Sequence, residues 1–329
     1  MKNKDLQEDS LQPVYAASRS VNTVPHGIMF HHFWDGKRKS VVGATTTEQL
    51  EKVISYYGVD NIIPAKDWFQ EATKGRFTGN KTCITLDDAL RSQIDYALPI
   101  LDRYGLTAFW FIYSSVFEEK ASNFEIFRYF SAVCFDSFDE FFDTFMSYLA
   151  KKENTSLVKS GRRAFVKSGH LQEYVFYTSR EREFRFFRDK VLGREKFEIL
   201  MGCMLVDSGV SYDDLSSGLW MTNDDLIDLT REGHVIGLHS YSHPTELNSL
   251  SYDDQKEEYQ KNMNHIEKVT GSRPKVVSHP VNSYDQKTLA ILGAMGVEIG
   301  FRSNMFKVNH GALEYPRADC TDVIEQMSN

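Results

Sequence analysis

The chain has 329 residues, which exceeds the roughly 100 to 200 residues of an ordinary domain, and 41% of its residues are hydrophobic, enough to bury a large core. Its 38 basic and 46 acidic residues give a net charge of −8. Because nucleic-acid binding depends on neutralising phosphates, this balance argues against a nucleic-acid partner.

Residues 1–24 are predicted to form a flexible N-terminal arm, since the first 20 alternate charged and polar side chains. They lack the apolar run of a secretory signal, and no stretch of about 18 apolar residues predicts a membrane span. The four cysteines form no Cys-x-x-Cys pair, which favours free thiols in a reducing compartment. We therefore expect a cytoplasmic protein without a membrane span.

The segment Gly27–Phe33 is predicted to be the first strand, and it contains two adjacent histidines, His31 and His32. Neighbouring side chains of a strand point to opposite faces, so only one of the two can face inward. An isolated histidine is more often structural, but His31 remains a candidate catalytic residue. A helix over Thr45–Tyr57, a short strand over Asn61–Pro64 and a strand over Lys81–Leu86 are predicted to follow.

Two acidic residues, Asp87 and Asp88, follow the third strand, at the kind of carboxyl end where barrels place active sites. Far downstream, His239 and His243 are four residues apart in a His-Ser-Tyr-Ser-His segment. On one face of a helical turn, both imidazoles could bind one metal ion. Catalytic zinc usually takes three protein ligands, and a carboxylate is an acceptable third. Since adjacent strand residues point to opposite sides, one aspartate could bind metal while the other meets a water molecule.

The two motifs resemble those of the polysaccharide deacetylase family, also called carbohydrate esterase family 4 or the NodB homology domain. That family has a Thr-Phe-Asp-Asp-Gly motif and a His-Ser/Thr-x-x-His motif, whereas this chain has Thr-Leu-Asp-Asp-Ala at 85–89 and His-Ser-Tyr-Ser-His at 239–243. The resemblance covers residues 26–117 and 218–320. Either motif alone would favour a capped turn or a surface pair, but their joint occurrence favours a metal site.

The resemblance implies an α/β fold: a distorted (β/α) barrel of about seven strands with a helical insertion. The barrel is expected at 25–117 and 210–329, and the insertion at 118–209. Because the insertion leaves the catalytic end of the barrel, it is expected to cover the active site. Its aromatic residues recur every three or four positions over Phe127–Leu149, which predicts an amphipathic helix packed on the barrel, or alternatively a sugar-stacking surface.

Within the insertion, residues 151–196 contain 13 basic and 6 acidic residues. Such an excess most often marks a solvated surface. The alternative is a site for an anionic part of the substrate, such as the phosphates of a nucleotide-linked sugar. In that case the basic residues facing the mouth of the barrel would include Arg162, Arg163, Arg182 and Arg185.

The resemblance assigns a divalent metal to Asp88, His239 and His243, with zinc favoured and cobalt, nickel or iron also compatible. It assigns Asp87 as the base that takes a proton from water. The implied reaction is hydrolysis of an N-acetyl or N-formyl group on an amino sugar or sugar conjugate. Since relatives are often exported and no signal is visible here, we expect a role in surface-glycan biosynthesis.

Two family features are missing. The arginine that orients the catalytic aspartate is replaced by Ser278; Arg302 or Arg317 could restore the charge, and Arg317 is preferred. The late Leu-x-His motif, which supplies a general acid, is not visible. The candidate substitutes are His279, His31 and His310, and the residues expected to contact substrate are Pro280, Tyr284 and Tyr241.

These gaps keep a second function open, a carbohydrate-binding protein that retains the metal but has lost most or all turnover. A serine hydrolase is disfavoured, because no Gly-x-Ser-x-Gly elbow is present. The leading prediction is a metal-dependent carbohydrate N-deacetylase whose partner is a small molecule or glycan that carries an N-acyl amino sugar.

Overall fold

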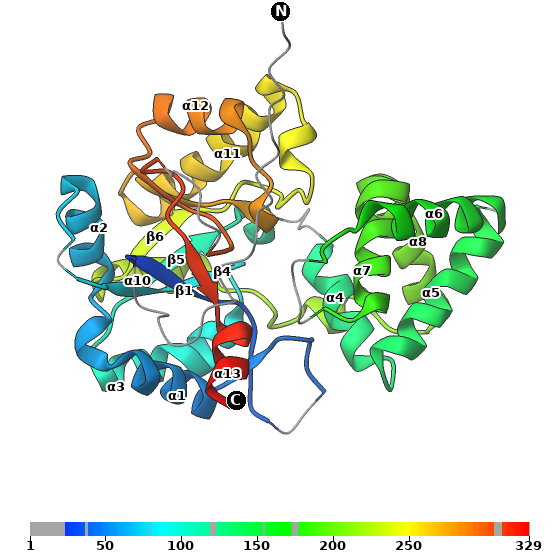
Figure 1. Cartoon of the computed structure of the whole chain (residues 1–329), viewed down its shortest axis with the longest axis horizontal. Helices are drawn as coiled ribbons and strands as arrows, with labels where there is room; N and C mark the ends of the chain where they lie inside the picture. Colours follow the sequence, from blue (N-terminus) through cyan, green and yellow to red (C-terminus); the bar gives the residue numbers. More distant parts are fainter. Residues whose placement is uncertain are drawn as a thin grey trace, which may run out of the picture.

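A computed structural model describes residues 24–36, 39–77, 79–118, 123–153, 155–172, 177–305 and 311–328. They form two bodies side by side, a barrel surrounded by helices and a separate group of helices (Figure 1). The predicted N-terminal arm, apart from Val24, and the candidate acid His310 lie outside the described residues.

Seven parallel strands form the barrel, in the order β8-β7-β6-β5-β4-β1-β9. One segment of chain at the C-terminal end nearly closes the ring. In it, Tyr315 N–H donates to the Gly300 carbonyl of β8 (2.7 Å), and the Pro316 carbonyl accepts from Gly27 N–H of β1 (3.0 Å). The predicted α/β barrel of about seven strands is confirmed. The strands are β1 His26–Phe30, β4 Thr82–Asp87, β5 Phe109–Ile112, β6 Val235–Leu238, β7 Val276–Ser278, β8 Ile299–Phe301 and β9 Arg317–Asp319.

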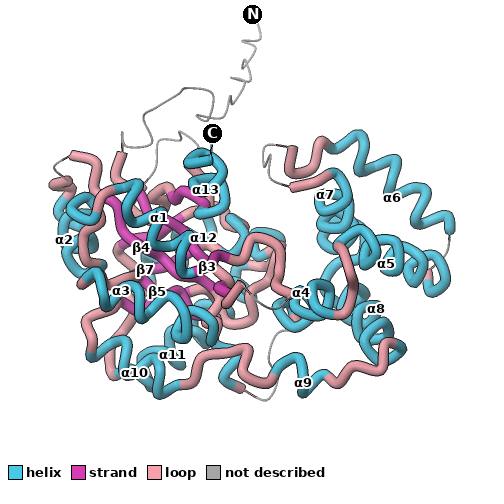
Figure 2. Tube along the Cα trace, turned by 90° about the horizontal axis from the view of Figure 1, so that it is seen from below, coloured by secondary structure: helices cyan, strands magenta, loops and turns pink. Residues whose placement is uncertain are grey.

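The barrel strands are short apolar runs that are buried on both faces, as parallel strands covered by helices require. Figure 2 shows the helices arranged around them. The predicted first strand ends early, at Phe30, and the predicted strand over Asn61–Pro64 is reduced to one bridge between Ile62 and Thr82. The covering helices are α1 Thr47–Tyr57, α2 Ala65–Lys74, α3 Leu98–Tyr104, α10 Asn223–Arg231, α11 Tyr252–Thr270, α12 Gln286–Ala294 and α13 Cys320–Ser328.

Short elements connect the barrel units. A two-stranded sheet follows β1, and five short helical segments lie in the loops of the barrel. Their bounds are β2 Phe33–Trp34, β3 Thr45–Thr46, η2 Val59–Asn61, η3 Gln93–Ala97, η4 Ser114–Phe117, η6 Leu247–Ser249 and η7 Pro280–Asn282.

The insertion forms its own helical body beside the barrel (Figures 1 and 2). The aromatic stretch predicted as one helix is two, because the chain leaves helical conformation after Val133 and Ser137 caps a new helix. The prediction that its aromatic face packs on the barrel is also wrong. Phe130, Phe141 and Phe145 are fully buried in a core of the helical body itself. The helices are α4 Phe124–Val133, α5 Phe138–Lys152, α6 Thr155–Ser168, α7 Ser179–Phe186, η5 Phe187–Leu192, α8 Gly193–Asp207 and α9 Tyr212–Ser216.

The barrel has a distinct core of its own, which includes Ile28, Leu86 and Trp110. Trp220 packs against both cores. All four cysteines are free thiols. Among the helices of the described residues, none combines the length and apolarity that a membrane crossing would need.

Candidate metal centre

Asp87 and Asp88 lie where β4 ends and the chain turns sharply. Asp88 and Ala89 have φ angles of 82° and 55°, so the chain is not extended after Asp87. The expected opposite orientation of the two aspartates is therefore not observed, and both carboxylates line the same cavity. Backbone strain of this kind in non-glycine residues is often found at functional sites.

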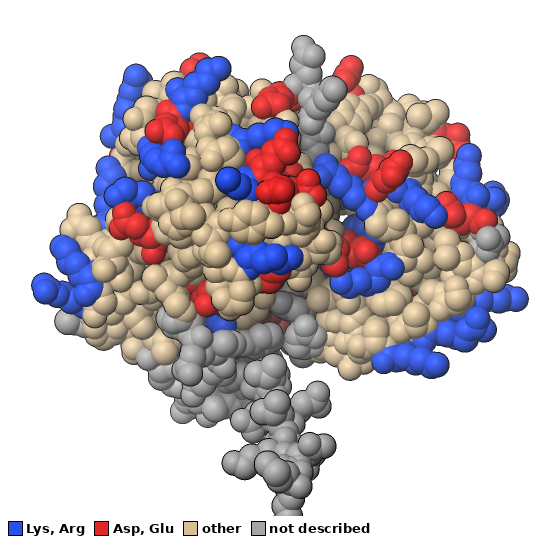
Figure 3. Space-filling view, turned by 90° about the horizontal axis from the view of Figure 1, so that it is seen from above, with Lys and Arg blue, Asp and Glu red and all other residues tan. Residues whose placement is uncertain are grey.

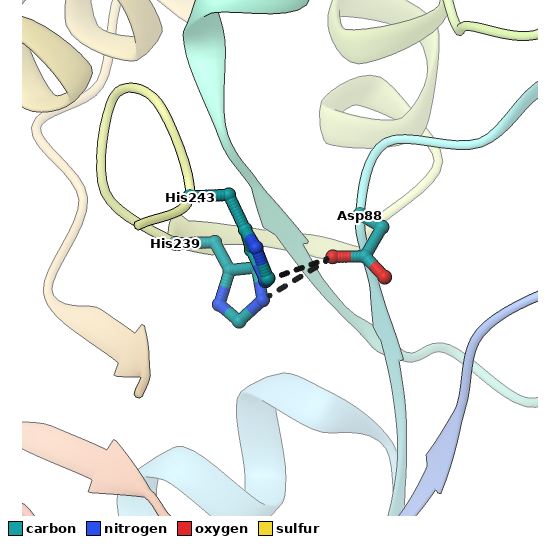
Figure 4. Close-up of side chains that lie close together, drawn as sticks. All are labelled: Asp88, His239 and His243. Atoms are coloured by element: carbon teal, nitrogen blue, oxygen red, sulfur yellow. Dashed lines mark ion pairs between the residues drawn. The ribbon is translucent and has the colours of Figure 1, made fainter. Parts of the chain in front are cut away.

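The two histidines follow β6, in a loop and not in the helical turn that their spacing suggested. Ser240 and His243 have φ angles of 62° and 52°, which a right-handed helix excludes. The loop nevertheless turns both imidazoles toward Asp88 (Figure 4). The centroids of the two rings are 4.8 Å apart.

Helix α11 holds this loop in place through two polar side chains. Asn262 accepts the backbone N–H of His239 (3.0 Å) and donates to the Ile112 carbonyl of β5 (2.8 Å). Glu258 Oε2 accepts the backbone N–H groups of Tyr241 and Ser242, at 3.0 and 2.8 Å. The loop conformation thus depends on α11, which explains why motif spacing alone did not predict it.

Three ligand atoms meet in the centre. The Nε2 atoms of His239 and His243 each lie 3.4 Å from Asp88 Oδ1 (Figure 4). His239 Nδ1 lies 2.8 Å from the Ser278 carbonyl, which can only accept, so in the neutral ring Nδ1 carries the proton and the Nε2 lone pair faces Asp88. Asp88 Oδ1 is buried and has no hydrogen-bond donor among the described residues. Two imidazoles and an orphaned carboxylate oxygen fit a divalent metal ion.

Protonation states in the centre also suit metal binding. Burial alone would raise the pKa of Asp88, but the neighbouring imidazoles lower it well below its usual range, so the carboxylate is ionised. Burial lowers the pKa of His243 to about 4, so its imidazole is neutral near pH 7. Ligands must be deprotonated to bind a metal, and these two already are.

Asp87 is paired with Arg317, which reaches it through the barrel interior. Arg317 Nη1 and Nη2 lie 2.7 and 2.8 Å from the two carboxylate oxygens of Asp87. The Ser278 hydroxyl donates to Asp87 Oδ2 (3.0 Å) and accepts from Arg317 Nη2 (2.7 Å). A Cβ atom at Gly27 would lie 3.0 Å from Arg317 Cγ, so the missing side chain leaves room for the arginine. The alternative, Arg302, takes part through its backbone carbonyl, which accepts from Arg317 Nε (2.9 Å).

The ion pair sets the charge of Asp87. Burial alone would raise its pKa, but Arg317 and then His239 lower it, and the net pKa lies below the ordinary value. Asp87 is thus ionised near pH 7 and can accept a proton. Its Oδ2 is 3.8 Å from His239 Nε2, so this carboxylate lies beside the candidate metal triad.

A cavity of about 540 Å³ opens onto the centre and is lined by Asp87, Asp88, His239 and His243. Two further predicted residues, His31 and His279, also line it. His31 Nε2 is 4.0 Å from Asp87 Oδ2. His279 Nε2 lies 2.8 Å from the Leu313 carbonyl, and burial lowers the pKa of His279 to about 4.

The three residues expected to contact substrate are not among the described residues that line this cavity. Tyr241 donates its hydroxyl to Glu118 (2.6 Å) and lines a neighbouring cavity of about 620 Å³. Tyr284 stacks on His279 with ring centroids 4.0 Å apart, and Pro280 is buried. Of the four insertion arginines expected at the mouth, Arg185 lines the cavity of the metal centre, whereas Arg162, Arg163 and Arg182 are not part of its described wall.

Gln93 is a positioning residue that sequence reasoning missed. Its Nε2 donates to the backbone carbonyls of Asp87 (2.5 Å) and His31 (2.9 Å), so it ties together the two strand ends that carry the candidate base and acid. A glutamine six residues after an aspartate carries no sequence signal of such a role. Ser278 did carry a signal, because it occupies the position where the family has arginine.

The family model described as polysaccharide deacetylase matches residues 207–300, which contain the two histidine ligands. The Asp-Asp motif lies outside that match but completes the same triad. Over these residues the chain is similar to the polysaccharide deacetylase family. At the level of sequence, no curated protein gives a significant match to this chain.

Solved structures of similar fold include three proteins that span the barrel and the insertion. The deacetylase PplD of Streptococcus pyogenes, in complex with acetate, is 11% identical, with a TM-score of 0.53 over 93% of this chain and 99% of that chain. IcaB of Ammonifex degensii is 13% identical, with a TM-score of 0.52 over 93% and 95% of the two chains. A de-N-acetylase of Aggregatibacter actinomycetemcomitans is 10% identical, with a TM-score of 0.53 over 90% and 95%. At these identities, the likeness shows a shared fold.

Proposed function

We propose that this protein is a metal-dependent hydrolase that removes an N-acetyl or N-formyl group from an amino sugar or sugar conjugate. The observation that carries the proposal is the ionised, arginine-paired Asp87 beside the triad of Asp88, His239 and His243, at the end of one cavity. The proposal includes zinc as the metal, with cobalt, nickel and iron as alternatives. It also includes the cytoplasmic location and the role in surface-glycan biosynthesis that the sequence led us to expect.

Asp88, His239 and His243 would hold a divalent ion, which would supply Lewis acidity for an acyl carbonyl and for water. Asp87 then takes the proton of the attacking water, since Arg317 keeps its carboxylate ionised and fixed in orientation. His31 is our candidate for the proton donor to the leaving amine, because it lines the cavity within 4.0 Å of Asp87. His279 is less suited to that step, since its lowered pKa leaves it without a proton to give near pH 7.

The alternative function, a carbohydrate-binding protein without turnover, drew on two missing family features. Arg317 in contact with Asp87 removes the first of them, the absence of an arginine at the candidate base. His31 at the same carboxylate offers a substitute for the second. Both observations favour the enzyme over the binding protein.

The test is release of acetate or formate from N-acetylated and N-formylated amino sugars, free and nucleotide-linked, by the metal-loaded protein. Asp87→Asn should lower the rate on the order of 10²-fold or more while metal content, measured by elemental analysis, stays unchanged. His243→Ala should lose the metal while the barrel stays folded. Asp228→Asn, which changes an exposed carboxylate in α10, is the matched control and should behave as wild type. Full activity of Asp87→Asn, or no acyl release by wild type from any of these sugars, would remove the proposal.

A further inference from the structure

The wall of the cavity contributed by the helical body is rich in arginine. Arg128 of α4, Arg185 of α7 and Arg188 of η5 all line it, and Asp87, Asp88 and the two histidines line it from the barrel. On the surface shown in Figure 3, by contrast, basic and acidic side chains lie interspersed.

Two of these arginines already have carboxylate partners. Arg188 makes two hydrogen bonds to Asp189, of 2.6 and 2.7 Å. Arg128 Nη1 lies 3.4 Å from Glu125, whose other oxygen is bound to His32 at 2.5 Å. Glu125 is thus shared, and Arg128 is only partly neutralised.

Arg185 has no such partner. Its guanidinium lies over the Tyr177 ring, 4.0 Å from the ring centroid. Its Nε is buried without a hydrogen-bond acceptor, and no described carboxylate lies within ion-pairing distance. Burial lowers the pKa of Arg185 below its ordinary value. Tyr177 acts in the opposite direction and raises this pKa, whereas the like charges of Arg188 and Arg128 lower it further. Arg185 as a whole is half-buried, and a partly buried charge without a counterion at a cavity wall is a suitable position for an anion.

The acidic residues of the cavity have other partners, and although the charge of Glu181 acts on Arg185, none of them forms an ion pair with it among the described residues. Glu181 belongs to the N-terminal cap of α7, where its carboxylate accepts the Thr178 N–H at 2.8 Å. The remaining pairs are Asp136 with Lys39 (2.8 Å), Glu246 with Lys190 (2.7 Å) and Asp319 with the N–H of Thr321 (2.9 Å).

We propose that Arg185, flanked by Arg128 and Arg188, binds an oxyanion on the same substrate whose N-acyl group reaches the metal centre. The substrate class is then an N-acyl amino sugar that carries a phosphate or a carboxylate. This inference rests on the proposed function. A planar guanidinium matches either oxyanion through two parallel hydrogen bonds. One cavity of about 540 Å³ contains both the arginines and the triad, a volume within the usual range for small-molecule sites, roughly 300 to 1,000 Å³.

The experiment compares three probes by calorimetry on the full-length, metal-loaded Asp87→Asn protein, in which turnover is suppressed. The probes are N-acetylglucosamine, N-acetylglucosamine 1-phosphate and N-acetylglucosaminuronic acid. The charged sugars should bind at least about tenfold more tightly than the neutral one, and added salt should reduce the difference. The order of the two charged probes distinguishes phosphate from carboxylate. Equal affinity for all three probes at low salt would overturn the proposal, and this test needs no variant of Arg185.

Variants then test whether Arg185 causes the preference for the charged sugars. Arg185→Gln should abolish the preference for the charged sugars and leave the affinity for N-acetylglucosamine unchanged, and Arg185→Lys should restore part of it. Arg163→Gln removes the same charge from an exposed position of the helical body and is the matched control. A preference that survives in folded Arg185→Gln, checked by circular dichroism, would contradict the assignment.

The outcome also separates this inference from the proposed function. Tight, Arg185-dependent binding of a charged sugar, with no acyl release from it by protein carrying the native Asp87, would keep the anion site and reject the hydrolase. Equal acyl release from neutral and charged sugars, unaffected by Arg185→Gln, would keep the hydrolase and reject the anion site.

Discussion

Arg317 and Asp87 are 230 positions apart in the sequence and form a bidentate ion pair inside the barrel. Arg317 lies on β9, which pairs with β1, and Asp87 ends β4, the other neighbour of β1. The arginine side chain therefore passes β1, where Gly27 leaves space for it. All five N–H groups of Arg317 have acceptors: Asp87 twice, and Thr85, Ser278 and the Arg302 carbonyl once each.

Substitutions of Arg317 should separate the effect of its charge from the effect of its two hydrogen bonds to Asp87. Arg317→Lys keeps a positive charge but cannot hold both oxygens of Asp87, so we expect a loss of activity of at least about tenfold with unchanged metal content. Arg317→Met leaves the buried carboxylate of Asp87 without its charged partner and should lower the free energy of unfolding by about 3 to 5 kcal/mol. Urea denaturation and elemental analysis measure the two effects. Arg103→Lys, at an exposed ion pair, is the control, and a Met variant as stable as wild type would contradict this account.

The sequence was sufficient to predict the site residues that belong to a local motif. Asp87, Asp88, His239 and His243 were recognisable because short motifs with matching flanks place them at strand ends. Their conformation was not predictable from the motif. The positive φ angles at Asp88 and His243 depend on contacts with distant parts of the chain, such as Asn262 and Glu258.

Residues of the site that act through long-range packing were harder to predict. The sequence indicated that an arginine was missing at Ser278 and offered two replacements; only the closure of the barrel by β9 brings the Arg317 guanidinium to Asp87. In the insertion, helical periodicity located the aromatic residues correctly but could not say what they pack against. Arg162 and Arg185 both lie in the basic stretch, yet Arg185 lines the cavity and Arg162 forms an exposed ion pair with Glu183.

Acidification should weaken zinc binding to the extent expected when one proton, and not two, competes with the metal for its ligands. In the metal-free protein, burial lowers the pKa of His239 but Asp87 and Asp88 raise it, and the net pKa lies above its ordinary value, so one proton must leave before metal binds. Since the pKa of His243 is lowered to about 4, that ligand carries no competing proton at higher pH. Below the raised pKa of His239, and down to about pH 5, affinity should drop about tenfold per pH unit. Competition with a zinc-sensitive dye measures this, and a hundredfold drop per unit would show that both imidazoles titrate.

The helical body should lose stability independently of the metal centre. Phe145 is fully buried in its core, with ring centroids of Phe184 and Phe197 at 5.0 and 6.3 Å. Phe145→Ala should lower the free energy of unfolding of this body by about 3 to 5 kcal/mol, because a cavity is left. Zinc content should remain, since the barrel has a separate core. Val166→Ala, at a side chain that is 78% exposed, is the control; loss of zinc in the folded Phe145 variant would show that the two bodies are coupled.

His234 should make the barrel sensitive to acid at a point remote from the proposed chemistry. It is buried between β5 and β6, and its Nδ1 accepts the Ala108 N–H at 2.9 Å, which a protonated ring could not do. Burial lowers its pKa to about 4, whereas the unfolded chain has the ordinary value near 6.5. Between these two values the unfolded state binds more protons, so stability rises with pH: the contribution is complete above about pH 6.5 and is lost as the pH falls toward 4.

The size of this effect follows from the same shift and is on the order of 3 kcal/mol. His234→Asn keeps an acceptor for the Ala108 N–H but cannot titrate. Urea denaturation of both proteins from pH 7 to pH 4 should therefore show wild type losing about that much more stability than the variant. Other buried histidines with lowered pKa values, such as His26 and His279, are present in both proteins, so their contributions cancel in the difference. Parallel stability curves for the two proteins would mean that the pKa of His234 is not lowered in the folded protein.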